Sequence, residues 1–217
     1  MNINFTPIMK YIPFILGGIV ITLQVAVTGA LFGSILGLLF GLSSRKKGIA
    51  GRAVKLFVDF FRGTPIVFQL MFFHYGLPQI TGWNPTVFTT AAIIFSLNSS
   101  AYLAEILRAG IESIDKGQIE AAVALGVKKS DISLHIIIPQ AIRNVLPAIM
   151  NEFITLTKET SVISMIGGSD LVRRQSIVSG TTYHFFEPLI IVGVVYFLLN
   201  IVLSTIGKRI ERKLNYD

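Results

Sequence analysis

The chain consists of long apolar segments separated by short polar ones. Five segments are apolar over a length sufficient to cross a bilayer, and they span roughly residues 11–42, 54–80, 86–109, 141–166 and 185–206. A crossing helix requires about 20 mostly apolar residues, and residues 11–44 contain no Asp, Glu, Lys or Arg. The pattern predicts an all-α integral membrane protein in which residues 1–217 form one domain with five transmembrane helices.

Composition supports the membrane class. Hydrophobic residues make up 52% and charged residues 14% of the chain, whereas a typical soluble domain is about 25% charged. The chain has no cysteine, which excludes disulfides and thiolate metal sites. The three histidines are far apart in the sequence, so they do not indicate a metal site.

The distribution of Lys and Arg predicts an orientation, because membrane proteins keep most of these residues on the cytoplasmic side. With the amino terminus outside and the carboxyl terminus in the cytoplasm, fifteen of the nineteen fall on the cytoplasmic side, including Arg45, Lys46 and Lys47. The outside then holds only Lys10, Arg173 and Arg174, and Lys158 lies within a span. The net charge of +7 therefore reflects basic residues that are sorted to the cytoplasmic side of the lipid membrane. We expect no nucleic-acid partner.

The first predicted helix carries glycine at every fourth position, at Gly29, Gly33, Gly37 and Gly41. One face of that helix lacks side chains, so another helix can approach its backbone closely. The pattern does not say which helix does so; a helix of the same chain is slightly favoured over one of a second subunit.

A polar island, residues 110–140, lies between the third and fourth predicted spans. Within it, Glu120, Ala121 and Ala122 belong to a segment with helical propensity, and Gly126 is placed to end that helix. We expect a second short helix capped by Ser130 or Asp131. Periodicity alone leaves open whether this is an ordinary amphipathic loop or a docking element.

The spacing EAA, then G, then I-x-x-P, carried by Glu120 to Pro139, resembles the EAA loop of ATP-binding cassette (ABC) importer permeases; Ile138 stands where leucine is frequent in that pattern. FRGTPIVFQLMFFHYGLP, NSSAYLAEILRAGIESIDKGQIEAA and NEFITLTKETSVIS, which start at residues 61, 98 and 151, extend the resemblance over nearly the whole chain. Together these segments look like the polar amino acid branch of that family.

The resemblance implies a type I importer-like permease subunit in a prokaryotic plasma (inner) membrane, with residues 110–140 as the cytoplasmic coupling loop. It implies three protein partners: a cytoplasmic ATPase, a second permease subunit, for which a homodimer is the simpler expectation, and an extracytoplasmic amino acid-binding protein. It also assigns ATPase coupling to Glu120, Ala121, Ala122 and Gly126. The chain has no G-x-x-x-x-G-K-[ST] phosphate loop, so we expect no enzyme activity and no cofactor, with ATP and Mg²⁺ bound by the partner ATPase.

Ionisable and polar side chains within the spans are candidates for contact with the solute, because burying a charge in a membrane is costly. The candidates are Asp59, Asn98, Ser99, Glu152, Thr155, Lys158 and Glu159. The acids on the fourth predicted helix outnumber Lys158, which favours a cationic amino acid. Two couples, Asp59 with Arg62 and Glu105 with Arg108, could instead pair locally at a spacing of three, and Gly63 and Pro65 predict a broken helix beside the first couple.

Several alternatives remain at this point. The permease could carry glutamine or glutamate, the intramembrane charges could form a structural ion network, and the chain could be an ATP-independent channel or secondary transporter. The EAA spacing argues against the last. A membrane enzyme is disfavoured because no nucleophile and base can be named from the sequence.

Overall fold

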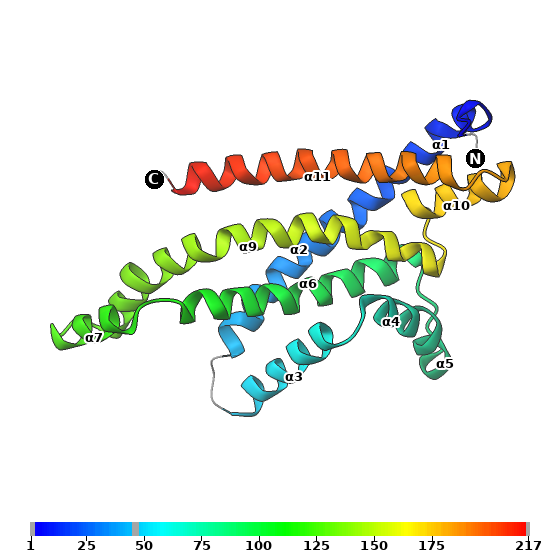
Figure 1. Ribbon diagram of the computed structural model, residues 1–217. Coiled ribbons are helices and arrows are strands. Elements are labelled where there is room, and N and C mark those ends of the chain that lie inside the picture. Colours follow the sequence, from blue (N-terminus) through cyan, green and yellow to red (C-terminus); the bar gives the residue numbers. More distant parts are fainter. Residues whose placement is uncertain (1–2, 45–47, 216–217) are drawn as a thin grey trace.

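The computed structural model describes residues 3–44 and 48–215, and every regular element in these ranges is helical (Figure 1). In chain order the elements are η1 (Thr6–Tyr11), α1 (Ile12–Leu16), α2 (Gly18–Ser44), α3 (Ile49–Gly63), α4 (Ile66–Met71), η2 (Phe72–Gly76), α5 (Leu77–Thr81), α6 (Val87–Glu112), α7 (Lys116–Ala124), α8 (Lys129–Asp131), η3 (Ile132–Ile137), α9 (Ile138–Glu159), η4 (Thr160–Ile166), α10 (Leu171–Thr182) and α11 (Phe186–Asn215). Arg45, Lys46 and Lys47 lie outside the described residues.

Within the described residues, four helical stretches are long and apolar enough to cross a membrane: Thr6–Gly41, Val87–Glu112, Lys129–Ile166 and Phe186–Lys213. A fifth crossing is provided if the bent pair Ile49–Gly63 and Ile66–Thr81 counts as one span; its two helices meet at 105°. This confirms the predicted all-α membrane fold class and the predicted break beside Gly63 and Pro65. The described chain begins and ends at opposite ends of the molecule; α7 lies at one end, with the carboxyl terminus, and α10 at the other, with the amino terminus (Figure 1).

The glycine face of α2 packs against α6 of the same chain, as the slightly favoured interpretation predicted. A Cβ atom added to Gly33 would lie 2.7 Å from the Cβ of Ser99, and one added to Gly37 would lie 2.7 Å from the Cβ of Leu103. Such approaches are too close for real Cβ atoms, so each glycine is required by the helix–helix distance. Gly29 and Gly41 continue the same contact against Phe95 and Leu107.

The main core lies where α2, α4, α6, α9 and η4 meet, and Phe95 is fully buried at its centre. Its other buried members are Val25, Leu70, Ala91, Ile94, Leu156, Ile163 and Ile166. A second cluster at the α10 end joins η1, α1, α10 and α11, and a small third cluster joins α3 to α6. One face of α6 thus packs closely against α2. Its other faces meet α3, α4 and α9, and polar side chains gather there.

Candidate functional site: two polar cavities and an exposed helix

The bend between α3 and α4 is held by two side-chain amides. A broken membrane helix leaves backbone carbonyls without partners, and these must be satisfied inside the protein. The Gln69 amide nitrogen donates to the carbonyls of Phe61 and Thr64, at 2.9 and 3.1 Å, and to the Thr64 hydroxyl at 2.9 Å. The Asn98 amide nitrogen donates to the Phe61 carbonyl and to Gln69 Oε1, at 3.2 and 3.1 Å.

A cavity of about 290 Å³ opens at this bend. We call it the bend cavity; it is lined by Arg62, Gly63, Thr64, Pro65, Ile66, Asn98, Tyr102 and Glu159. Arg62 lies over the Tyr102 ring, with 5.6 Å between the guanidinium carbon and the ring centroid. The walls therefore combine a cation, an aromatic face, an amide and a carboxylate, which is a set of groups able to orient a small polar solute.

Helix α9 contributes the acids near the bend cavity. Because α9 is a regular helix through Glu159, Glu152, Thr155 and Glu159 share one face, as their spacing predicts. Glu159 lines the cavity, and Glu152 lies within electrostatic reach of both Glu159 and Arg62. The two acids and Arg62 thus form one charged environment across α3 and α9.

Of the seven sequence-predicted candidates, Asn98 and Glu159 line the bend cavity, whereas Asp59, Ser99, Glu152, Thr155 and Lys158 do not. Ser99 is fully buried, lines none of the described cavities and packs against Gly33 of α2, so the structure gives it a helix-packing role. Lys158 is exposed on α9 and makes no ion pair with the described residues. Neither residue lines the bend cavity with Glu159 and Asn98.

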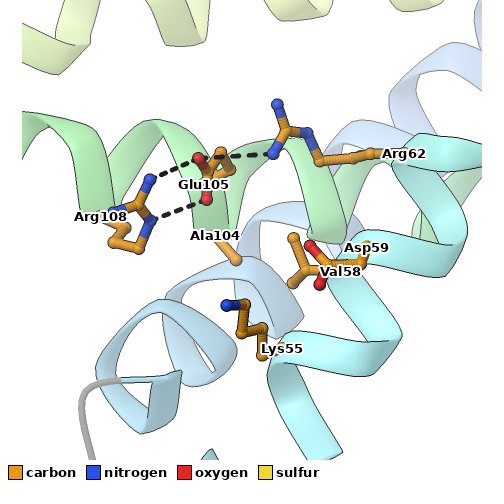
Figure 2. A pocket seen from close by; sticks show the side chains of 7 residues that line it. All are labelled: Lys55, Val58, Asp59, Arg62, Ala104, Glu105 and Arg108. Carbon is orange, nitrogen blue, oxygen red and sulfur yellow. Dashed lines mark hydrogen bonds and ion pairs between the residues drawn. The ribbon is translucent and has the colours of Figure 1, made fainter. Parts of the chain in front are cut away.

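A second cavity of about 300 Å³ lies between α3 and α6 (Figure 2). We call it the charged cavity; it is lined by Lys55, Val58, Asp59, Arg62, Ala104, Glu105 and Arg108. Arg62 is the residue common to both cavities. Since α6 runs from Asn98 past Glu105 towards α7, the charged cavity is displaced from the bend cavity towards the α7 end.

Ion pairs in the charged cavity differ in part from the local couples considered in the sequence. Glu105 and Arg108 do pair, with Oε1 and Nη2 2.7 Å apart. Arg62, however, pairs with Glu105 of α6 at 3.4 Å and makes no ion pair with Asp59 of its own helix among the described residues. The Asp59–Arg62 alternative was therefore wrong, because the cross-helix partner Glu105 lies within reach of the guanidinium.

Helix α7 projects from one end of the molecule on a braced support (Figure 1). The carboxylate of Asp115 caps its first turn by accepting from the Gly117 nitrogen at 2.6 Å. The Gln140 amide nitrogen donates to Gln118 Oε1 at 2.8 Å, which ties α7 back to α9. These two hydrogen bonds fix the start of α7 and its position relative to α9.

The end of α7 is a Schellman motif centred on Gly126. The Val127 nitrogen donates to the Ala122 carbonyl, and the Gly126 nitrogen donates to the Val123 carbonyl, each at 3.0 Å. Gly126 has φ of +77°, in the left-handed region that favours glycine. This confirms that the helix ends at this glycine.

The exposed surface of α7 and the turn after it carries small side chains, apolar side chains and a carboxylate. Glu120 and Ala121 are exposed, Ala122 faces inward, and Leu125 is 83% exposed. Beyond Gly126 the predicted second helix begins earlier than expected, at Lys129, with no side-chain cap from Ser130 or Asp131. It continues through η3 into α9, so Lys129–Ile166 forms one helical stretch rather than a separate short helix.

Comparison with known proteins establishes the class. Residues 29–216 match the family described as binding-protein-dependent transport system inner membrane component, and the chain belongs to that family. It is therefore a multi-pass permease subunit of an ABC importer, as the EAA spacing predicted, and the hydrolysis of ATP takes place in a separate ATPase.

Two relatives illustrate the likeness at the sequence level. An arginine transport system permease protein, ArtQ, from Bacillus subtilis is 47% identical over 99% of this chain and 98% of its own length. A glutamine transport system permease protein, GlnP, from Escherichia coli is 36% identical, with 99% of each chain covered.

Among solved structures, an amino acid ABC transporter crystallised with histidines matches with a TM-score of 0.91 and 38% identity, covering 98% of this chain and all of that one. The MetNI methionine ABC transporter in an inward-facing conformation matches with a TM-score of 0.75 at 22% identity over 96% of this chain and 98% of that one. At that identity the second likeness concerns the fold alone.

Two residues important to the cavities were missed from the sequence. Gln69 carries no charge and lies in an apolar run, but it is 4% exposed and makes three hydrogen bonds across the bend. The sequence could have identified Gln69, because a glutamine within a span, four residues after a Gly–Thr–Pro break, is well placed to satisfy the carbonyls that the break leaves free. Tyr102 gave no comparable signal.

Proposed function

We propose that this chain forms the translocation path of an ATP-driven importer of cationic amino acids, with arginine as the best candidate. The observation that carries the proposal is the bend cavity, which both Glu159 and Arg62 line at a break in a membrane helix. An amino acid requires an anionic acceptor for its ammonium group and a donor for its carboxylate, and these two side chains supply both.

The surplus of acid supports a cationic side chain. Glu152 and Glu159 both face this region, and Arg62 already shares its charge with Glu105. A neutral or acidic solute would leave one partly buried carboxylate without a counter-charge, which is unfavourable. The arginine permease from Bacillus subtilis, at 47% identity, supports the same choice.

Glutamine is a second candidate for the solute, because some relatives are permeases for it. The E. coli relative and one from Rickettsia felis, at 36% and 43% identity, are glutamine permeases. For glutamine, the side-chain amide nitrogen would donate hydrogen bonds to Asn98 Oδ1 and to the Glu159 carboxylate instead of forming an ion pair.

The site of coupling in this proposal is α7 with Gly126. The helix presents a low surface at Ala121, a carboxylate at Glu120 and an apolar tip at Leu125, which suits insertion into a groove of a soluble ATPase. The α7 end is then cytoplasmic and the amino terminus outside. ATP and Mg²⁺ bind the ATPase alone, the second permease subunit is an identical copy, and a receptor protein delivers the solute at the α10 end.

The decisive experiment reconstitutes the permease with its ATPase and receptor in proteoliposomes and measures ATP-dependent uptake of labelled arginine, glutamine and glutamate. Arginine should be preferred, and Glu159→Gln should reduce arginine uptake more than tenfold, as loss of a charge-assisted contact predicts. Glu211→Gln on α11, which lines none of the described cavities, is the matched control. Preference for glutamine, or full arginine uptake by Glu159→Gln, would overturn the cationic assignment.

A further inference from the structure

The charged cavity contains a cation and an anion that no neighbour neutralises. Lys55 and Asp59 lie four residues apart on α3, yet neither makes an ion pair with any described residue. The other ionised groups of the cavity are occupied with one another, since Glu105 binds both Arg62 and Arg108. Figure 2 shows Lys55 and Asp59 along the α3 wall, apart from the paired groups on α6.

Unpaired charges of opposite sign in one cavity are complementary to a zwitterion. The ammonium of Lys55 can bind a carboxylate, and the carboxylate of Asp59 can bind an ammonium group. A lysine that precedes its acid at this spacing is the less favourable order for pairing along a helix, so a ligand does not have to displace a strong internal bond.

The charged cavity is similar in size to the bend cavity and shares Arg62 with it. The volumes are about 300 and 290 Å³, at the lower end of the range for small-molecule sites. Arg62 lines both, with its guanidinium over Tyr102 of the bend cavity and 3.4 Å from Glu105 of the charged one. A solute carboxylate bound to Arg62 can therefore reach either cavity without losing that contact.

We infer that the charged cavity is a second amino acid-binding station, in which Lys55 binds the solute carboxylate and Asp59 its ammonium group, with Arg62 transferring the solute from the bend cavity. This inference rests on the proposed transport function and adds a release station on the α7 side of the path. Lys55 and Asp59 are positioned for it on the same helix that breaks at Gly63, so movement of that helix changes both stations together.

Binding stoichiometry tests the inference. In equilibrium dialysis of the purified permease–ATPase complex at saturating labelled L-arginine, the wild type should bind two molecules per permease subunit. Lys55→Met with Asp59→Asn should bind one, because the second site loses both of its charged contacts. The matched control is Lys208→Met with Glu211→Gln on α11, which should bind two. All variants should show the same melting temperature, because Lys55, Asp59 and Lys208 are exposed and Glu211 is only partly buried.

The outcomes separate this inference from the proposed function. One arginine per wild-type subunit, lost in Glu159→Gln but kept in the Lys55/Asp59 variant, would overturn the second station and keep the bend cavity as the only one. No arginine bound by a complex with intact ATPase activity would overturn the cationic assignment and the station with it. In uptake assays, the Lys55/Asp59 variant should lower kcat and leave KM unchanged, since release follows capture.

Discussion

The two sides of α6 are built in opposite ways. Towards α2 it packs backbone against backbone through four glycines, with no room for an added methyl group at Gly33 or Gly37. Towards α3 and α4 it meets a broken helix, buried amides and two cavities with charged walls. The contrast shows how one central helix can be anchored on one side while cavities remain on the other. Close packing without side chains gives rigidity, and polar groups around a break give space.

The largest effect on stability is expected from disrupting the contact between α2 and α6. Gly33→Leu would force a side chain into Ser99 of α6, and overpacking of a well-packed contact typically costs about 1–3 kcal/mol or more. We expect loss of folded protein in detergent, measured by size-exclusion chromatography and thermal melting. Gly193→Leu on α11, where an added Cβ meets no atom within 4 Å, should behave as the wild type. Equal stability of both variants would remove the distinction between the two sides.

The second-largest effect is expected at the bend between α3 and α4, on the side of α6 that faces the cavities. Gln69→Leu removes the side-chain donor of the Thr64 carbonyl and one of the two side-chain donors of the Phe61 carbonyl, and an unsatisfied buried polar group costs about 1–3 kcal/mol. We expect a lower melting temperature and loss of uptake, because the bend cavity is shaped by this bend. Gln79→Leu on α5 replaces an exposed glutamine and serves as the control. Uptake at wild-type level in Gln69→Leu would mean that the bend does not depend on this amide.

Gly126→Val tests α7, where we expect a substitution to affect coupling to the ATPase more than protein stability. A β-branched residue at φ of +77° costs about 1–2 kcal/mol of local strain but meets no neighbouring atom. We expect the permease to insert and fold while uptake and transport-coupled ATP hydrolysis fall sharply. Gly180→Val on α10 also meets no atom within 4 Å and has no positive φ, so it should leave coupling intact. Normal coupling in Gly126→Val would contradict the docking role of α7.

The smallest effect is expected at the α10 end. Arg174 donates from Nη1 to the Phe14 carbonyl at 2.8 Å and lies 4.9 Å from the Phe14 ring centroid. Arg174→Ala should lower stability by about 0.5–1 kcal/mol, as expected for an exposed cation–π contact. Arg173→Ala removes a neighbouring exposed arginine without that contact and should have no measurable effect on melting. Indistinguishable variants would show that this end is held by its apolar cluster alone.

Local patterns in the sequence were sufficient for several features. The length of the apolar runs predicted the helical membrane class, Gly63 and Pro65 predicted the break, and Gly126 predicted the end of α7. Each follows from the preferences of a few neighbouring residues, so no distant contact is needed to infer it. The glycine repeat indicated a close helix neighbour, but only the structure identified α6 as that neighbour.

Features that join distant segments required the tertiary structure. Arg62 had a plausible acid three residues away in Asp59, yet it pairs with Glu105, which is far along the chain and near in space. Ser99 and Asn98 are adjacent in sequence, yet one packs against α2 and the other braces the bend. Spacing along a helix fixes the face on which a side chain lies, whereas its partner depends on which helix covers that face. The sequence by itself thus determined the membrane class, the apolar spans and the end of α7 at Gly126. Only the tertiary structure showed that the helix after Gly126 runs on into α9, and only the packing of α3, α6 and α9 decided which charges meet and where cavities remain.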